Sequence, residues 1–416
     1  MSIVQLNFWL MPNGDFDTLS AIEKEITHFE KWHTNIHIEP TIIPWSHAWD
    51  RLMNVHKQQG ELVAPDVIQI GTTWVSTLNY LGVLRDISAF FDEDITSDII
   101  IPLKESSISY ETGGFMAMPW MADIRMLYYR IDILRLYGFS SRDLEDFDSF
   151  RNVCLVIQSK RKSPDDIMAF RLSGHSEVVL IHDLAPWIWG MGGHLLSANL
   201  KKVSFDSPQA RKAIHWYFDL VNDLYGGKDS HKRYGIIPTG SFFSGNFATE
   251  IIGKSPLYNL SNLKHSNYSQ EVAKNYGVVN LPKGPEGSFP FIGGSSLAVP
   301  KWSRYPEEAA EWIRFLVSSE SQMRHGYRIG VFPSRISLLQ NYFKDYKEDY
   351  EVIATTLKNG RSLPYSPLLG TLERILSAFS DHVLMAIRSG EYTSDFLDRE
   401  INQAAMEANY IFSMYM

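Results

Sequence analysis

Residues 291–322 decide the fold and read FIGGSSLAVPKWSRYPEEAAEWIRFLVSSESQ. The paired glycines Gly293 and Gly294 lack Cβ atoms, so the backbone there can bend sharply or approach another segment closely. The apolar run at residues 297–299 predicts a buried strand. A helix is expected from Pro306, because proline suits the first helical position and the acidic residues after it suit the positive end of the helix dipole. A bent strand followed by an amphipathic helix is typical of α/β proteins.

The N-terminal part alternates strands and helices. Strands are predicted at residues 3–11, 36–44 and 65–71, with helices at residues 19–32 and from Trp45 onward. This order predicts a parallel sheet with crossover helices, whose ligands bind beyond the carboxyl ends of the strands. The rule places Asn13, Trp45, Thr73 and Trp74 along one edge of the sheet.

Residues 113–129 form a long, mostly apolar segment that predicts a strand. Asp123 and Arg125 stand at alternate positions in it and therefore on one face. One interpretation is a structural ion pair between these two residues. The other is a crossover between domains, in which Trp120, Asp123 and Arg125 face a cleft.

The middle of the chain continues the α/β pattern. Helices are predicted at residues 131–136, 147–159 and 207–224, and a strand at residues 276–281. Residues 185–193 predict an aromatic, glycine-rich turn that carries Trp187 and Trp189. We assign Trp32, Trp216 and Trp312 to the core, since they stand at helical spacing among apolar neighbours.

Composition limits the classes of function. A chain of 416 residues is expected to form two domains of about 200 residues each. A net charge of -9 without a basic run argues against nucleic acid and against anionic membrane surfaces. The only cysteine, Cys154, excludes an internal disulfide and a cysteine-based zinc site. No apolar stretch is long enough to span a membrane, and the first residues predict a strand rather than a signal segment.

Motifs for catalysis, cofactors or metals are not found. Residues 253–255 read GKS, but Ala248 stands where a phosphate-binding loop needs its first glycine. Residues 293–297 end in leucine rather than in the glycine of a nucleophile elbow. We therefore expect a protein that is not an enzyme and that has no cofactor and no metal site.

Four motifs together indicate a family. They are APDVIQIG at residues 64–71, GVLRDI at 82–87, the segment 116–129 with its Pro119-Trp120, and residues 293–335, which end in GVFPSR. With these the chain resembles the extracellular solute-binding proteins of bacterial ABC importers, family 1, whose members mostly bind maltodextrins and other oligosaccharides. It departs from the family at residues 244–250, which read SGNFATE where Gly-Lys-Ala-Ala-Met is usual.

The resemblance implies an α/β fold of two lobes, the type II periplasmic-binding-protein-like fold, with mostly parallel sheets flanked by helices. It implies a ligand cleft between the lobes that closes by hinge motion. The N-terminal lobe would comprise residues 1–118 and 292–326, and the C-terminal lobe residues 119–291 and 327–416. Hinge crossovers are expected near residues 118–126, 291–298 and 322–334.

The abundance of aromatic residues, 13% of the chain, favours a sugar as the ligand. A pyranose needs a flat apolar ring beneath its C–H face and fixed donors and acceptors around its hydroxyls. Each tryptophan could instead belong to the core. The predicted ligand-binding residues are Asn13, Trp45, Thr73, Trp74, Trp120, Asp123, Arg125, Trp187, Trp189, Gly294, Ser295 and Arg335.

The resemblance therefore predicts a monomeric solute-binding component that captures a carbohydrate, a di- or oligosaccharide, and delivers it to the membrane permease of an ABC importer. Its location would be periplasmic, or extracellular and membrane-anchored as a lipoprotein. One alternative is a carbohydrate-active enzyme such as a glycoside hydrolase, which needs two carboxylates across the scissile bond, whereas only Asp123 is placed at the cleft. Another is a cytosolic or sensor sugar-binding module.

Overall fold

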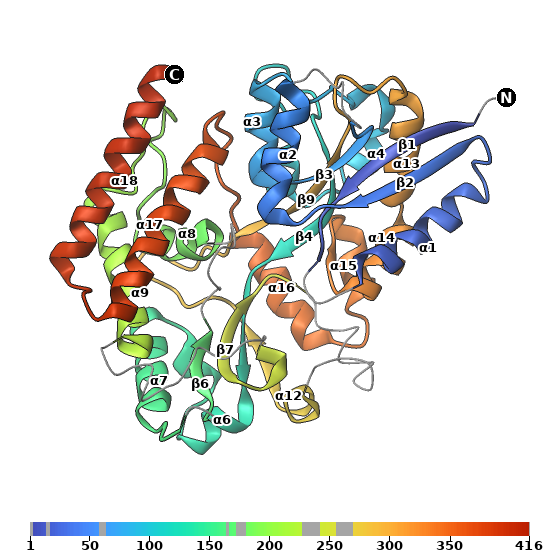
Figure 1. Ribbon diagram of the computed structural model, residues 1–416. Coiled ribbons are helices and arrows are strands. Elements are labelled where there is room, and N and C mark those ends of the chain that lie inside the picture. The colour runs from blue at the N-terminus through green and yellow to red at the C-terminus, as the bar shows by residue number, and fades with distance from the viewer. Residues whose placement is uncertain are drawn as a thin grey trace. The chain divides into compact units, whose positions relative to one another are not determined.

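The computed structural model describes residues 3–13, 17–57, 64–163, 166–171, 180–226, 242–254 and 269–415. The chain divides into two compact units, and each has its own sheet flanked by helices (Figure 1). Unit 1 comprises Met1–Asp123, Ile292–Tyr346 and Ser362–Gly370. Unit 2 comprises Ile124–Phe291, Lys347–Arg361 and Thr371–Met416.

The chain passes between the units at five points. The first two follow Asp123 and Phe291, inside or next to the predicted crossovers at residues 118–126 and 291–298. The third comes after Tyr346, so residues 322–334 lie within unit 1 and not at a crossover. A buried carboxylate explains this difference, because Glu25 accepts hydrogen bonds from Ser321 Oγ and Arg324 Nε, each at 2.9 Å. These bonds hold the segment after residue 319 to the first helix of unit 1.

Unit 1 contains a sheet of six strands in the order β10-β4-β9-β3-β1-β2. β1, β2 and β3 are parallel, as predicted, whereas β9 runs antiparallel to β3 and β10 antiparallel to β4. The strands are β1 Val4–Leu10, β2 Ile36–Ile42, β3 Val67–Gly71, β4 Met118–Ile124, β9 Ile292–Ala298 and β10 Phe332–Pro333. The helices are α1 Thr18–Glu30, α2 Trp45–Lys57, η1 Thr72–Trp74, α3 Val75–Tyr80, η2 Ser88–Phe90, α4 Glu93–Thr96, α5 Ile101–Ser107, α13 Pro306–Leu316, α14 Ser319–Ile329 and α15 Ile336–Tyr342.

The stretch at residues 291–322 forms the strand and helix expected of it. β9 lies between β4 and β3 in the sheet of unit 1, and α13 begins at Pro306. Gly294 has a φ of 147°, and a Cβ there would lie 2.0 Å from the carbonyl oxygen of Met121. Glycine is therefore required at this position, since no side chain fits against the neighbouring strand.

Unit 2 contains a sheet of four strands in the order β6-β7-β5-β8. β6 and β7 are parallel, and β5 runs antiparallel to both β7 and β8, so the mostly parallel sheet predicted for this part is wrong among the described residues. The strands are β5 Met126–Arg130, β6 Met168–Arg171, β7 Phe247–Ile252 and β8 Tyr276–Val279. The helices are α6 Ile131–Leu136, η3 Ser141–Leu144, α7 Phe147–Ser159, α8 Leu180–Gly190, α9 Pro208–Tyr225, η4 Phe242–Ser244, α12 Gln270–Lys274, α16 Lys347–Asn359 and α18 Ser394–Tyr415, with α17 Leu369–Ser389 beginning in unit 1.

Three predictions of local structure need correction. The single strand predicted at residues 113–129 is two strands, β4 and β5, interrupted at Arg125. The turn predicted at residues 185–193 is mostly helix α8, which contains Pro186 and ends at the glycines. Trp32 is 79% exposed, because α1 ends before it, whereas Trp312 is fully buried as predicted. In the described part of the chain no helix is both long and apolar enough to cross a membrane.

Candidate functional site

The carboxyl ends of β1, β2 and β3 gather several predicted site residues in unit 1. Trp45 Nε1 donates a hydrogen bond to the carbonyl oxygen of Pro12 at 3.0 Å. The rings of Trp45 and Trp74 meet edge to face, with their centroids 5.6 Å apart. Gly71 lies between their elements, and a Cβ there would lie 3.7 Å from Thr73 Oγ1 and 3.9 Å from the Trp45 ring. The rule that ligand-site residues follow the carboxyl ends of parallel strands thus predicted correctly that Trp45 and Trp74 lie close together.

Three more predicted residues lie in or beside this group. The backbone N–H of Gly294 donates to Thr72 Oγ1 at 3.3 Å, and Ser295 pairs with Gly71 across β9 and β3. Asn13 is buried, and its Nδ2 has no hydrogen-bond partner among the described residues. We call the following set the unit 1 edge: Asn13, Trp45, Thr73, Trp74, Gly294 and Ser295.

Trp120 lies in the core of unit 1 and not on a binding surface. Its side chain is 1% exposed. The ring stacks on His325 with centroids 4.9 Å apart and meets Phe8 edge to face at 6.4 Å. The faces of the indole are thus covered by protein, and the stacking role predicted for Trp120 does not fit this placement.

Arg335 is also held by a structural contact within unit 1. Its Nε donates to Asp98 Oδ2 at 2.8 Å, and its NH1 donates to Ser319 Oγ at 3.1 Å. Partial burial by itself would raise the pKa of Asp98, but hydrogen bonds from Ser337 and Arg335 lower it below the usual value. The pair joins the loop before α5 to the start of α15, and the role of Arg335 in binding stays a prediction.

Arg125 forms an ion pair, but not with the predicted partner. Its guanidinium contacts the carboxylate of Asp183, from α8 of unit 2, and both side chains are buried. Asp123 is half-buried and is the last residue of the first segment of unit 1. The proposed Asp123–Arg125 pair is thus replaced by a pair with a residue that sequence patterns did not single out.

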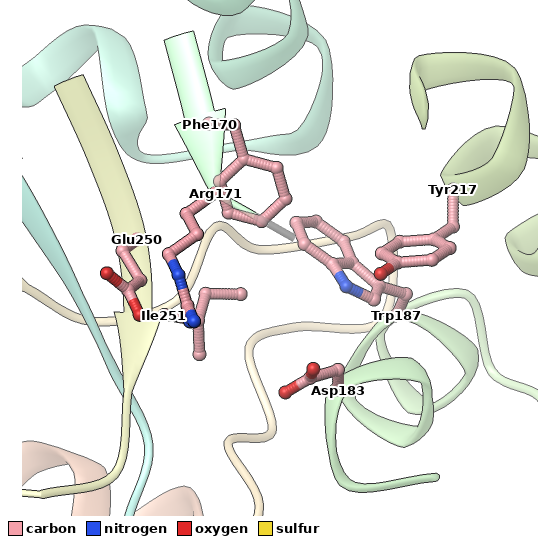
Figure 2. Close-up of a pocket in the computed structure, with 7 residues that line it drawn as sticks. All are labelled: Phe170, Arg171, Asp183, Trp187, Tyr217, Glu250 and Ile251. Carbon is pink, nitrogen blue, oxygen red and sulfur yellow. Dashed lines mark hydrogen bonds and ion pairs between the residues drawn. The ribbon is translucent and has the colours of Figure 1, made fainter. Parts of the chain in front are cut away.

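Asp183 is part of a pocket in unit 2 (Figure 2). The pocket lies at the carboxyl ends of the parallel strands β6 and β7, with α8 and α9 across from them. Its free space is small, because most of its lining side chains are buried. We call it the unit 2 pocket, and its lining residues are Phe170, Arg171, Asp183, Trp187, Tyr217, Glu250 and Ile251.

Charged groups form one side of the unit 2 pocket. Arg171 NH1 lies 2.7 Å from Glu250 Oε1, and the backbone N–H of Phe242 donates to the other carboxylate oxygen of Glu250. Burial raises the pKa of Glu250, with a further contribution from Asp183, and the charge of Arg171 opposes this. The two carboxylates therefore share one environment, and each of them has a guanidinium partner.

Aromatic rings form the other side. The indole of Trp187 stacks on Trp216, with centroids 4.7 Å apart, and packs against Phe147 at 4.8 Å. Burial, together with the charge of Asp183, raises the pKa of the Tyr217 hydroxyl, so this group stays protonated. Trp189, the other tryptophan predicted here, is buried and is not among the residues that line the pocket.

Sequence patterns missed Arg171, Asp183 and Glu250. Arg171 and Glu250 are 79 residues apart, so no local spacing connects them. A signal was nevertheless present, since Asp183 interrupts an apolar helix and Glu250 interrupts the apolar strand FATEII. A charge in a buried element needs a partner, which makes such residues candidates for a polar site. Among the described residues, no cluster of three or more His, Cys, Asp or Glu side chains could hold a metal ion.

Comparison with known proteins gives consistent matches. Residues 24–354 match the family model described as bacterial extracellular solute-binding protein. A probable ABC transporter-binding protein of Deinococcus radiodurans is 26% identical over 238 residues, covering 55% of this chain and 53% of that relative. The match therefore spans about half the length of that curated relative.

Solved structures share the fold. A solute-binding protein of Thermotoga lettingae bound with α-D-tagatose has a TM-score of 0.79 at 20% identity, covering 98% of this chain and 100% of that one. The maltose-bound MalE3 of T. maritima has a TM-score of 0.75 at 22% identity, with the same coverage. These likenesses confirm the predicted two-lobed, periplasmic-binding-protein-like α/β fold.

Proposed function

Since the chain belongs to the bacterial extracellular solute-binding proteins, we propose that it is the carbohydrate-binding component of an ABC importer. It captures a sugar outside the cytoplasmic membrane and delivers it to the permease subunits. The name of the Deinococcus relative supports the transporter, and the tagatose- and maltose-bound structures support the ligand class. In this proposal the ligand is a di- or oligosaccharide, and the protein acts as a monomer anchored at the outer face of the membrane.

The unit 2 pocket is the observation that carries the choice of a sugar. It places the rings of Trp187 and Tyr217 opposite the ion pair between Arg171 and Glu250. Both rings are buried, and Trp187 is packed against Trp216 and Phe147, so the pocket offers fixed hydrogen-bonding groups rather than an open ring face. Such groups match the rim of hydroxyls of a sugar. The unit 1 edge offers the partly buried ring of Trp45 beside small polar residues, and we propose that it contributes to binding as well.

The two carboxylates of the unit 2 pocket invite comparison with a glycoside hydrolase, which uses such a pair as acid and nucleophile or base. Here Asp183 and Glu250 each face a guanidinium, which favours structural and hydrogen-bonding roles over proton transfer. Members of the family are solute-binding proteins and not enzymes. We therefore expect a bound sugar to be released unchanged.

The proposal is tested by thermal shift and calorimetry with D-tagatose, maltose and longer maltodextrins, because a bound ligand raises the apparent melting temperature. The Trp45→Ala variant should bind about tenfold more weakly, as expected for the loss of one aromatic contact. Trp32→Ala removes an exposed tryptophan of the same unit and should bind normally. Failure of every sugar to bind, or NMR detection of hydrolysed sugar at catalytic turnover, would contradict the proposal.

A further inference from the structure

The unit 2 pocket contains a buried hydrogen-bond donor that no described residue accepts from. Trp187 is 1% exposed, and its Nε1 has no hydrogen-bond partner in the described part of the chain. Figure 2 shows the nitrogen on the side of the indole that is turned toward Arg171 and Ile251. An indole nitrogen can only donate, and a buried donor without an acceptor costs about 1–3 kcal/mol. A ligand oxygen in the pocket would supply the missing acceptor.

The charges of the described residues around the pocket cancel. Arg171 is paired with Glu250, and Asp183 with Arg125, which gives two positive and two negative side chains. Glu250, Asp183 and Arg125 are each 6% exposed, so water does little to screen them. From the described residues, an entering anion would meet two carboxylates and no uncompensated cation. An entering cation would meet two guanidinium groups and no uncompensated carboxylate. Either ion would lose its hydration without gaining a counterion.

We propose that the unit 2 pocket binds an uncharged, hydroxyl-bearing part of the sugar and rejects sugars that carry a carboxylate, phosphate or ammonium group there. One ligand oxygen accepts from Trp187 Nε1, and ligand hydroxyls donate to Glu250 or Asp183. This inference rests on the proposed function and specifies which chemical class of sugar the site takes.

Calorimetry with matched pairs of ligands tests the inference on the unmodified protein. The pairs are D-tagatose with D-tagatose 6-phosphate, maltose with α-maltose 1-phosphate, and D-glucose with D-glucuronate and D-glucosamine. The neutral member should bind at least about tenfold more tightly than its charged counterpart, a difference of about 1.4 kcal/mol. Tighter binding of a charged member overturns the inference and leaves the proposed function intact. Absence of binding by every sugar overturns both.

Two variants locate the selectivity in the pocket. Glu250→Gln keeps the shape of the side chain but leaves Arg171 uncompensated, so the ratio of anionic to neutral affinity should rise by about tenfold. Asp223→Asn is the matched control, because Asp223 pairs with Arg151 in the same unit but does not line the pocket. An unchanged ratio in Glu250→Gln, or an equal change in Asp223→Asn, overturns the assignment.

A third variant tests the donor. Trp187→Phe removes the indole N–H and keeps an aromatic ring, and it should weaken binding of the best neutral sugar by about three- to tenfold. Its melting temperature without ligand is measured in parallel to separate this effect from a loss of packing. Affinity equal to that of the unmodified protein would show that the ligand does not use Nε1. If a variant does not fold, the comparison of matched ligands decides the inference.

Discussion

The unit 1 edge is an uncharged group of aromatic and small polar residues, whereas the unit 2 pocket holds two ion pairs beside its aromatic wall. Most of the first group follows successive parallel strands, each of which delivers its next residues to the same edge of the sheet, whereas Gly294 and Ser295 lie within the antiparallel strand β9. The second is collected from two parallel strands and two helices, with Arg125 reaching in from the start of β5. The edge is therefore specified by local pattern, and the pocket by pairing between distant residues.

Mutations in the two regions are expected to affect different properties, ligand affinity in one and both affinity and stability in the other. At the unit 1 edge, Trp45 is only partly buried, so we expect its substitution to act mainly on binding, whereas Gly294 accepts no side chain. In the unit 2 pocket we expect binding and folding to be coupled, because a charge proposed to hold ligand also neutralises a buried partner. The predictions below test this division.

The largest effect is expected for Trp120→Ala. The side chain lies in the core of unit 1 between His325 and Phe8, so its removal should lower the free energy of unfolding by about 4 kcal/mol. Chemical denaturation measures this change, and calorimetry on the folded fraction should give nearly normal sugar affinity. The opposite pattern, weak binding with unchanged stability, would show that Trp120 contacts the ligand. It would then belong with the residues of the unit 1 edge and not with the core.

The next effect concerns the buried pair in unit 2. Arg125→Met leaves Asp183 without its guanidinium and should cost about 3 kcal/mol of stability, because a buried charge is left uncompensated. Arg151→Met breaks the more exposed pair with Asp223 in the same unit and should cost no more than about 1 kcal/mol. Replacing both Arg125 and Asp183 by apolar residues should recover much of the loss. Equal costs for the two single variants would show that burial does not distinguish the pairs.

The same division explains what the sequence could predict. Trp45 and Trp74 were placed together correctly because each follows a strand in a repeating strand-helix pattern. The partner of Arg125 could not be found this way, since Asp183 is 58 residues away and lies in a helix whose second half, from residue 185, was predicted as a turn. Trp32 was misassigned because helical spacing does not show where a helix ends. Periodicity thus predicts elements and faces, whereas ion pairs and the fit of large rings depend on tertiary packing.

The smallest expected effect is the pH dependence of stability that the unit 2 pocket contributes. Burial raises the pKa of Glu250, so the folded protein binds this proton more tightly than the unfolded chain does. The resulting stability is fully present below the pKa of the unfolded chain and is lost as pH rises through the folded pKa. The residues of the unit 1 edge have no group that titrates in this range.

Glu250→Gln replaces the titratable carboxyl group by an amide of the same shape. The unmodified protein should therefore lose stability relative to this variant as pH rises from about 4 to 7. Burial also raises the pKa of Asp349 to about 6, which would add a loss of the same sign from elsewhere in unit 2. Both proteins are therefore compared in an Asp349→Asn background, by urea denaturation at each pH. If the difference in free energy of unfolding between the two proteins is constant with pH, the charge of Arg171 fully offsets the effect of burial on the pKa of Glu250. A difference of opposite slope would mean that Arg171 outweighs burial, and the pocket would then stabilise the ionised carboxylate.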